Sequence, residues 1–226
     1  IDADPGWLVG LPTDPHAERV AEALGALANG WAGTRASYEE RGSVALPLFA
    51  VNGMYTGGPA PELLAGPQWD QLAITSRDGK TTSTTERSRT ERTVDLRTGV
   101  LVRRDATGLR TFRFVSPARP GALALRAEAP VTRLRPGPGL TPPGDAAAPA
   151  TLDARRRPGA GLARVHPPGA GGIAMGARDH HWVVDGRRVV ERLAAWTAAR
   201  SRTPAWSGAL EALDELEGLG FDRLLA

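Results

Sequence analysis

The segment from Val44 to Arg133 constrains the fold most, because short apolar runs alternate there with turn signals and show no helical period. The run Val44–Val51 is followed by Asn52-Gly53, and Leu72–Thr75 leads into Asp78-Gly79. Both dipeptides are hairpin signals. Strands this short and closely spaced, without helices between them, indicate antiparallel pairing. We therefore predict a mainly β protein built as an antiparallel β-sandwich.

Further strands are predicted along the chain. Phe112 and Phe114 alternate with Arg113, as in a half-buried strand. The Thr-rich stretch Thr81–Thr93 predicts an exposed or edge strand, because the branched Cβ of Thr packs well on a pleated surface. The clearest hairpin spans His181–Trp196 and turns at Asp185-Gly186, a pair that tolerates the positive φ angles of a type I′ turn.

Helices are predicted near the two ends. Apolar residues recur at helical spacing in His16–Asn29, and Asp14-Pro15 supplies an N-cap with a first-turn proline. Ser207–Glu217 has the same period, with Ser207 as the N-cap, and Phe221–Ala226 resembles the opening of another helix. The region 135–172 is dominated by Pro, Gly and Ala, which predicts a long loop carrying at most one strand, or alternatively a mobile linker.

Composition excludes several classes of function. The chain of 226 residues has no Cys, so it forms no disulfide and has no thiolate nucleophile or Cys-ligated metal site. Its net charge of +3 is dispersed, which argues against a nucleic-acid partner, and no apolar run is long enough to span a membrane. No secretory leader is visible, and we expect a cytoplasmic protein.

Two clusters of ionisable residues are candidate chemical sites. Glu39 and Glu40 are adjacent, and a facing pair of carboxylates suits acid–base chemistry. Neighbours in sequence diverge, however, so we favour a structural role in which one of them is buried and bonded to Arg35. The cluster Asp179-His180-His181 lacks a further ligand nearby, and we expect no metal site there.

Four aromatic residues are weak candidates for carbohydrate binding. They lie near predicted turns, where a ring could stack on a sugar; the alternative is that they fill the core. They are Trp31, Tyr38, Tyr55 and Trp69.

Five segments, in order along the chain, resemble the N-terminal domain of glycoside hydrolase family 65, whose members are phosphorylases and hydrolases of trehalose, maltose, kojibiose and similar α-glucosides. The first looks like the family's "LGNGxxGxRGxxEE" stretch, although Ala28 and Ala36 replace family glycines. The segments are Leu27–Glu40, Leu48–Tyr55, Val94–Arg103, Arg113–Ser116 and Gly220–Ala226.

The resemblance implies a supersandwich-like domain at 1–204 and a helical linker at 205–226 that is truncated before a catalytic (α/α)6 barrel. The parent would be an inverting enzyme acting on an α-glucoside sugar without a metal or organic cofactor. Its catalytic groups would lie in the barrel, so the resemblance implies no catalytic residue in this chain. The barrel could be joined in cis or encoded as a separate subunit, and a homodimer is a further possibility. This chain would brace the barrel and shape the sugar pocket, and Leu224 and Leu225 would form an exposed apolar patch where the barrel is missing.

A different class of function stays open. The chain could be a complete sandwich protein that binds a carbohydrate, or that encloses a small hydrophobic substrate and promotes its rearrangement or cyclisation by positioning.

Overall fold

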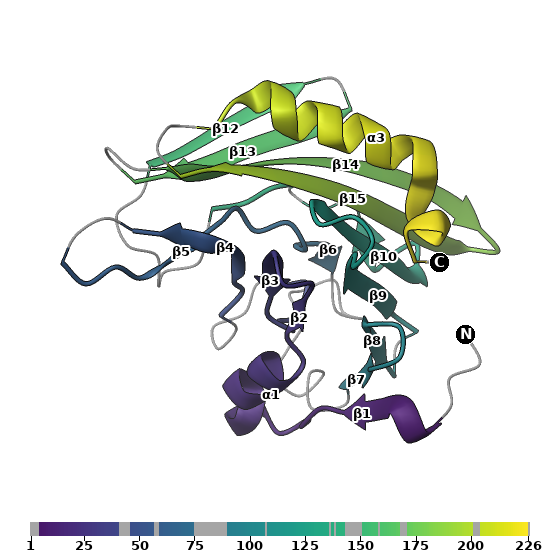
Figure 1. The fold of residues 1–226 in the computed structure, drawn as a ribbon. Helices are drawn as coiled ribbons and strands as arrows, with labels where there is room; N and C mark the ends of the chain where they lie inside the picture. Colours follow the sequence, from purple (N-terminus) through teal and green to yellow (C-terminus); the bar gives the residue numbers. More distant parts are fainter. Residues whose placement is uncertain are drawn as a thin grey trace.

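A nine-stranded antiparallel sheet forms the body of the molecule (Figure 1). The computed structural model describes residues 5–40, 46–56, 59–74, 90–106, 108–135, 137, 139–142, 151–157, 159–167, 171–200 and 204–225. In spatial order the strands of this sheet are β1 (Leu8–Gly10), β7 (Thr90–Asp95), β8 (Val100–Asp105), β9 (Arg110–Val115), β10 (Ala122–Pro130), β15 (Arg187–Ala199), β14 (Gly172–Val184), β13 (Ala160–His166) and β12 (Thr151–Arg157). The predicted β-sandwich is confirmed.

Two smaller sheets cover one face of the large sheet, which we call the inner face. Their strands are β2 (Leu27–Ala28), β3 (Ala32–Thr34), β4 (Phe49–Tyr55) and β5 (Leu63–Ala65) in one, and β6 (Ala73–Ile74) with β11 (Leu134–Arg135) in the other. Phe49 and Leu64 from the small sheet pack in one core with Leu123, Leu125 and Met175 from the large sheet. Burial of these apolar side chains is the main stabilising contribution.

Helix α3 (Trp206–Leu225) lies across the opposite, outer face of the large sheet, above β14 and β15 (Figure 1). Its buried face includes Leu213 and Leu216, which pack in a second core with Phe114 and Leu193. Gly220 has φ 72° and ψ 171°, so it separates the final turn from the longer helix, as the sequence predicts. The predicted apolar patch is wrong for Leu224, which is only 6% exposed because this final turn folds onto the sheet.

The N-terminal helix is shorter than predicted. The 3-10 turns η1 (Pro5–Trp7) and η2 (Pro15–Ala17) precede α1 (Glu18–Leu24), and the expected capping by Asp14 is confirmed by a 2.9 Å hydrogen bond from the His16 amide. The chain then enters β2 instead of continuing the helix. The predicted apolar face is also wrong in part: Val20 and Leu24 are exposed, whereas Glu18 and Glu22 are buried because polar partners satisfy them.

Of the two predicted hairpin turns that lie in described residues, Asp185-Gly186 is present and Asn52-Gly53 is not. Asp185 and Gly186 have φ 49° and 70° and join β14 to β15, as predicted. Asn52-Gly53 is not a hairpin turn: it lies inside β4, where the register against β5 shifts and Gly53 adopts φ 77°. Such an irregularity also uses the positive φ that glycine tolerates. Asp78-Gly79 and Thr81–Arg89 lie outside the described residues; the remainder of that predicted strand is in β7, which is paired on both sides.

The region 135–172 is not simply a loop, because β12 and β13 pair within it as a hairpin. Strand β13 is buried on both faces: Leu162 packs toward Gly176 and α3, while Val165 joins the inner core. Ala160 and Ala163 are buried in this strand as well, so the small residues of this stretch belong in part to a packed strand.

Candidate functional site

Glu39 and Glu40 both bind one buried arginine, Arg103 of β8. Its Nη1 donates to Glu39 Oε2 at 2.7 Å and to Glu40 Oε2 at 2.5 Å, and its Nη2 donates to Glu40 Oε1 at 2.8 Å. All three residues are almost completely buried. Both carboxylates are thus paired with Arg103 and not with the expected partner Arg35, which lies 3.5 Å from Glu22 on α1.

A second buried pair extends this network. Arg113 of β9 forms an ion pair with Asp70 and donates to the Ser37 carbonyl at 2.6 Å. Burial alone would raise the pKa of Glu39, but Arg113 and Arg103 outweigh it and hold that pKa below its ordinary value. For Asp70 burial prevails and raises the pKa. The network ties the segments around residues 37–40 and 70 to the large sheet, and its carboxylates face no solvent, so it suits a structural role.

The four aromatic candidates divide into two pairs. Tyr38 and Trp69 are 2% and 0% exposed, and the Tyr38 ring lies between the guanidinium carbons of Arg92 (4.2 Å) and Arg103 (4.7 Å). Neither ring offers a face on which a dissolved sugar could stack, so the structure assigns both to the interior. Trp31 and Tyr55 are 61% and 51% exposed.

The Asn29 side chain makes four of the hydrogen bonds that hold the loop displaying Trp31. Its Oδ1 accepts hydrogen bonds from the amides of Trp31 and Ala32, both at 3.0 Å. Its Nδ2 donates to the carbonyls of Ser116 (2.8 Å) and Pro120 (3.2 Å), across on the large sheet. An exposed tryptophan on a loop fixed in this way is prearranged to contact something outside the domain.

Trp31 borders a shallow groove of about 320 Å³ on the outer side of the four-stranded sheet. Leu63 of β5 and the backbone around Asn52 of β4 form its other side. The Trp31 groove is mostly apolar, which suits the apolar face of a sugar ring or a packed protein segment.

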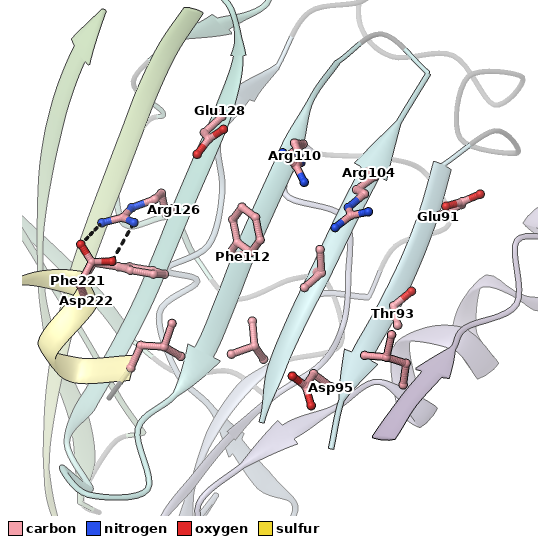
Figure 2. Close-up of a pocket in the computed structure, with 14 residues that line it drawn as sticks. Glu91, Thr93, Asp95, Arg104, Arg110, Phe112, Arg126, Glu128, Phe221 and Asp222 are labelled. Carbon is pink, nitrogen blue, oxygen red and sulfur yellow. Dashed lines mark hydrogen bonds and ion pairs between the residues drawn. The ribbon is translucent and has the colours of Figure 1, made fainter. Parts of the chain in front are cut away.

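A second groove of about 420 Å³ lies on the outer face of the large sheet, beside the end of α3 (Figure 2). We call it the arginine groove. Phe112 lies along its floor, Val102 also lines it, and charged side chains from β7, β8, β9 and β10 project around it. Its charged residues are Glu91, Asp95, Arg104, Arg110, Arg126, Glu128 and Asp222.

One arginine of this groove is fully engaged. Arg126 donates to Glu191 Oε2 at 2.8 and 3.1 Å and to the two carboxylate oxygens of Asp222 at 2.9 and 3.0 Å, and it stacks 4.3 Å from the centre of the Phe221 ring. Burial would lower the pKa of Arg126, but these hydrogen bonds outweigh it and raise the pKa. The same bonds lower the pKa of Asp222. Arg126 therefore anchors the last turn of α3 to the sheet.

The sequence did not identify the arginine groove, because its residues come from β1, four further strands and the end of α3, and no local motif predicts that these elements lie together. The only local signal was the alternation in β9, which places Arg110 and Phe112 on one face.

The histidine cluster does not converge. Asp179 binds Arg192 at 2.5 and 2.6 Å, and His180 lies 3.6 Å from Glu217. Within the part of the chain that the structure describes, no group of three or more His, Cys, Asp or Glu residues is placed to hold a metal ion. None of the helices in the described ranges is both long and apolar enough to cross a membrane.

Comparison with known proteins identifies the family. Residues 12–133, more than half of the chain, match the family described as "Glycosyl hydrolase family 65, N-terminal domain". A solved structure described as "Putative kojibiose phosphorylase from human microbiome" shares the fold with a TM-score of 0.72 and 15% sequence identity. The match covers 99% of this chain and 34% of that one, so the chain spans about a third of that protein's length. No curated protein sequence matches the chain.

Proposed function

We propose that this chain, which belongs to the N-terminal domain family of glycosyl hydrolase family 65, is the non-catalytic sandwich domain of an α-glucoside hydrolase or phosphorylase. In that role it braces a helical catalytic barrel, joined in cis or supplied as a separate subunit, and shapes the rim of the sugar pocket. An inverting reaction, a cytoplasmic location and a homodimer stay predictions.

The exposed position of Trp31 on a fixed loop is the main observation that supports this proposal. Asn29 uses both ends of its amide to fix the loop, and Trp31 lies in the segment that matches the family. Trp31 is 61% exposed and borders an apolar groove, an arrangement suited to contact with a ligand or a neighbouring domain. The buried carboxylates of Glu39, Glu40 and Asp70, in contrast, are each paired with Arg103 or Arg113, which supports placing the chemistry elsewhere.

Two measurements test the proposal. The purified 226-residue chain is expected to show no turnover of trehalose, maltose or kojibiose with water or with phosphate, and appreciable turnover overturns the non-catalytic role. In the enzyme assembled with its barrel, Trp31→Ala is expected to raise KM with little change in kcat, because the substituted ring shapes binding and not the chemical step. Trp182→Ala removes another exposed ring, at the tip of the β14–β15 hairpin, and is the matched control. Equal effects of the two substitutions would contradict a role for Trp31 at the sugar pocket.

The Trp31 groove also supports the alternative of a stand-alone carbohydrate-binding sandwich, because it is open in this chain. Titration of the isolated chain with maltose and kojibiose separates the two. Binding that Trp31→Ala abolishes, without any barrel partner, favours the stand-alone function.

A further inference from the structure

The upper row of the arginine groove places two like charges side by side. Backbone pairing aligns Glu91 with Arg104, Arg104 with Arg110, and Arg110 with Glu128, so four charged residues cross the sheet from β7 to β10 (Figure 2). Their order is acid, base, base, acid. Like charges directly opposite one another on a sheet are destabilising. An order in which acids and bases alternate would have avoided the pairing of Arg104 with Arg110.

The side chains of the two central arginines, Arg104 and Arg110, are also available to bind a ligand. Among the described residues, no ion pair or hydrogen bond engages the side chain of Arg104 or Arg110, and both are exposed. The guanidinium carbon of Arg110 lies 6.0 Å from the centre of the Phe112 ring. Arg126, by comparison, is held by two carboxylates. The groove thus contains one arginine that builds the fold and two whose donors are available.

A ring surface lies next to this pair of charges. Phe112 is two residues from Arg110 on the same face of β9, is half-buried, and is aligned with Val102 and Arg126 on the neighbouring strands. A groove of about 420 Å³ is within the size range of small-ligand sites. The floor therefore suits a planar or ring-shaped group held against Phe112 while an anion meets the arginines.

We propose that the arginine groove binds a small phosphate monoester carried on a sugar-sized ring, with the phosphate between Arg104 and Arg110 and the ring over Phe112. Two guanidiniums match the charge of a phosphate dianion and present paired N–H donors to its oxygens. Glu91 and Glu128 at the ends of the row repel a longer polyanion, which restricts the site to one compact phosphate. This site is separate from the Trp31 groove and does not depend on the proposed sugar-processing role.

Isothermal titration of the 226-residue chain with inorganic phosphate, glucose 6-phosphate and glucose tests the site. Both phosphates are expected to bind, glucose 6-phosphate more tightly, and glucose is expected not to bind at the groove. Binding should weaken as salt rises, because the contact is ionic. No binding of either phosphate at millimolar concentration overturns the proposal.

Variants separate a built site from a general attraction to positive charge. Arg104→Gln and Arg110→Gln are each expected to weaken glucose 6-phosphate binding at least about tenfold, the loss expected for one charge-assisted contact. Arg19→Gln removes an exposed arginine from α1, on the other layer of the molecule, and should leave binding unchanged. Equal losses in all three variants overturn the proposal.

Phe112 and thermal stability supply independent readouts. Phe112→Ala is expected to weaken glucose 6-phosphate binding while leaving inorganic phosphate binding unchanged, because only the sugar ring uses Phe112. Glucose 6-phosphate should raise the melting temperature of the wild-type chain and not that of the Arg104→Gln/Arg110→Gln double variant. Both arginines are exposed, so the double variant should fold; the same ligand-induced rise in both proteins contradicts the site.

Discussion

The Arg92 guanidinium donates to both carboxylate oxygens of Glu18, at 2.9 and 2.8 Å, and so joins α1 to strand β7 of the large sheet. Both side chains are buried, 2% and 5% exposed. The pair explains why α1 turns a glutamate inward while Val20 and Leu24 of the same helix face solvent. It also identifies the contact on which the position of α1 depends.

Removing one partner of that pair should be costly. Arg92→Ala leaves the Glu18 carboxylate buried without a partner, and we expect the free energy of unfolding to fall by about 3 to 5 kcal/mol. Urea denaturation followed by circular dichroism measures it. Arg19→Ala, on the exposed side of the same helix, is the control and should change stability little. Equal losses in both variants would show that the pair does not anchor the helix.

Asn29→Ala should loosen the Trp31 loop. It removes four hydrogen bonds that tie residues 29–32 to one another and to the β9–β10 connection, and we expect a loss of about 1 to 3 kcal/mol. Asn52→Ala removes one longer bond, 3.3 Å to the Gly30 carbonyl, and is the matched control with a smaller loss. Amide hydrogen exchange should show faster exchange at Trp31 and Ala32 in Asn29→Ala alone; unchanged protection there would count against the anchoring role.

Acid should weaken the contribution of Glu39. Its folded pKa lies below the ordinary value of 4.5, since Arg113 and Arg103 outweigh burial. The stability it contributes is therefore present above pH 4.5 and is lost as pH falls through the folded pKa. The destabilisation caused by Glu39→Gln should shrink as pH is lowered from 5 toward 3, in urea titrations at each pH. A destabilisation that grows over that range would contradict the assigned direction.

Glu22 should show the opposite sign. Burial raises its pKa above 4.5, more than the Leu46 amide and Arg35 lower it. A raised carboxyl pKa means that protonation favours the folded state, so the wild type should gain stability relative to Glu22→Gln as pH falls from 7 toward 4.5. The same urea titrations measure the difference. An unchanged difference between the two proteins over this range would refute the shift.

Leu213→Ala should open a cavity under α3. Leu213 is completely buried against the outer face of the sheet, and its truncation should cost about 2 to 5 kcal/mol. Leu210, on the same helix, is only partly buried, so Leu210→Ala is the control with a smaller loss. Similar losses at the two positions in thermal denaturation would argue that α3 does not pack as described.

Local signals in the sequence predicted the local parts of this fold. The Asp185-Gly186 hairpin and the break at Gly220 depend on neighbouring residues, and both are present. The partner of Glu39 could not be predicted, because Arg103 is 64 residues away and reaches it only through strand order. The same holds for the row of charges around Arg104 and Arg110, which exists only once β8 and β9 are in register.

A Cβ added at Gly220 would point into open space, yet the φ of 72° at this residue is one that side-chain-bearing residues rarely adopt. The final turn of α3 changes direction at this residue and brings Phe221 edge-on to Phe114, with ring centres 5.2 Å apart. A single backbone torsion therefore sets where Phe221 and Asp222 meet the sheet, and an alanine at this position would meet open space but strain that torsion, which would loosen both contacts.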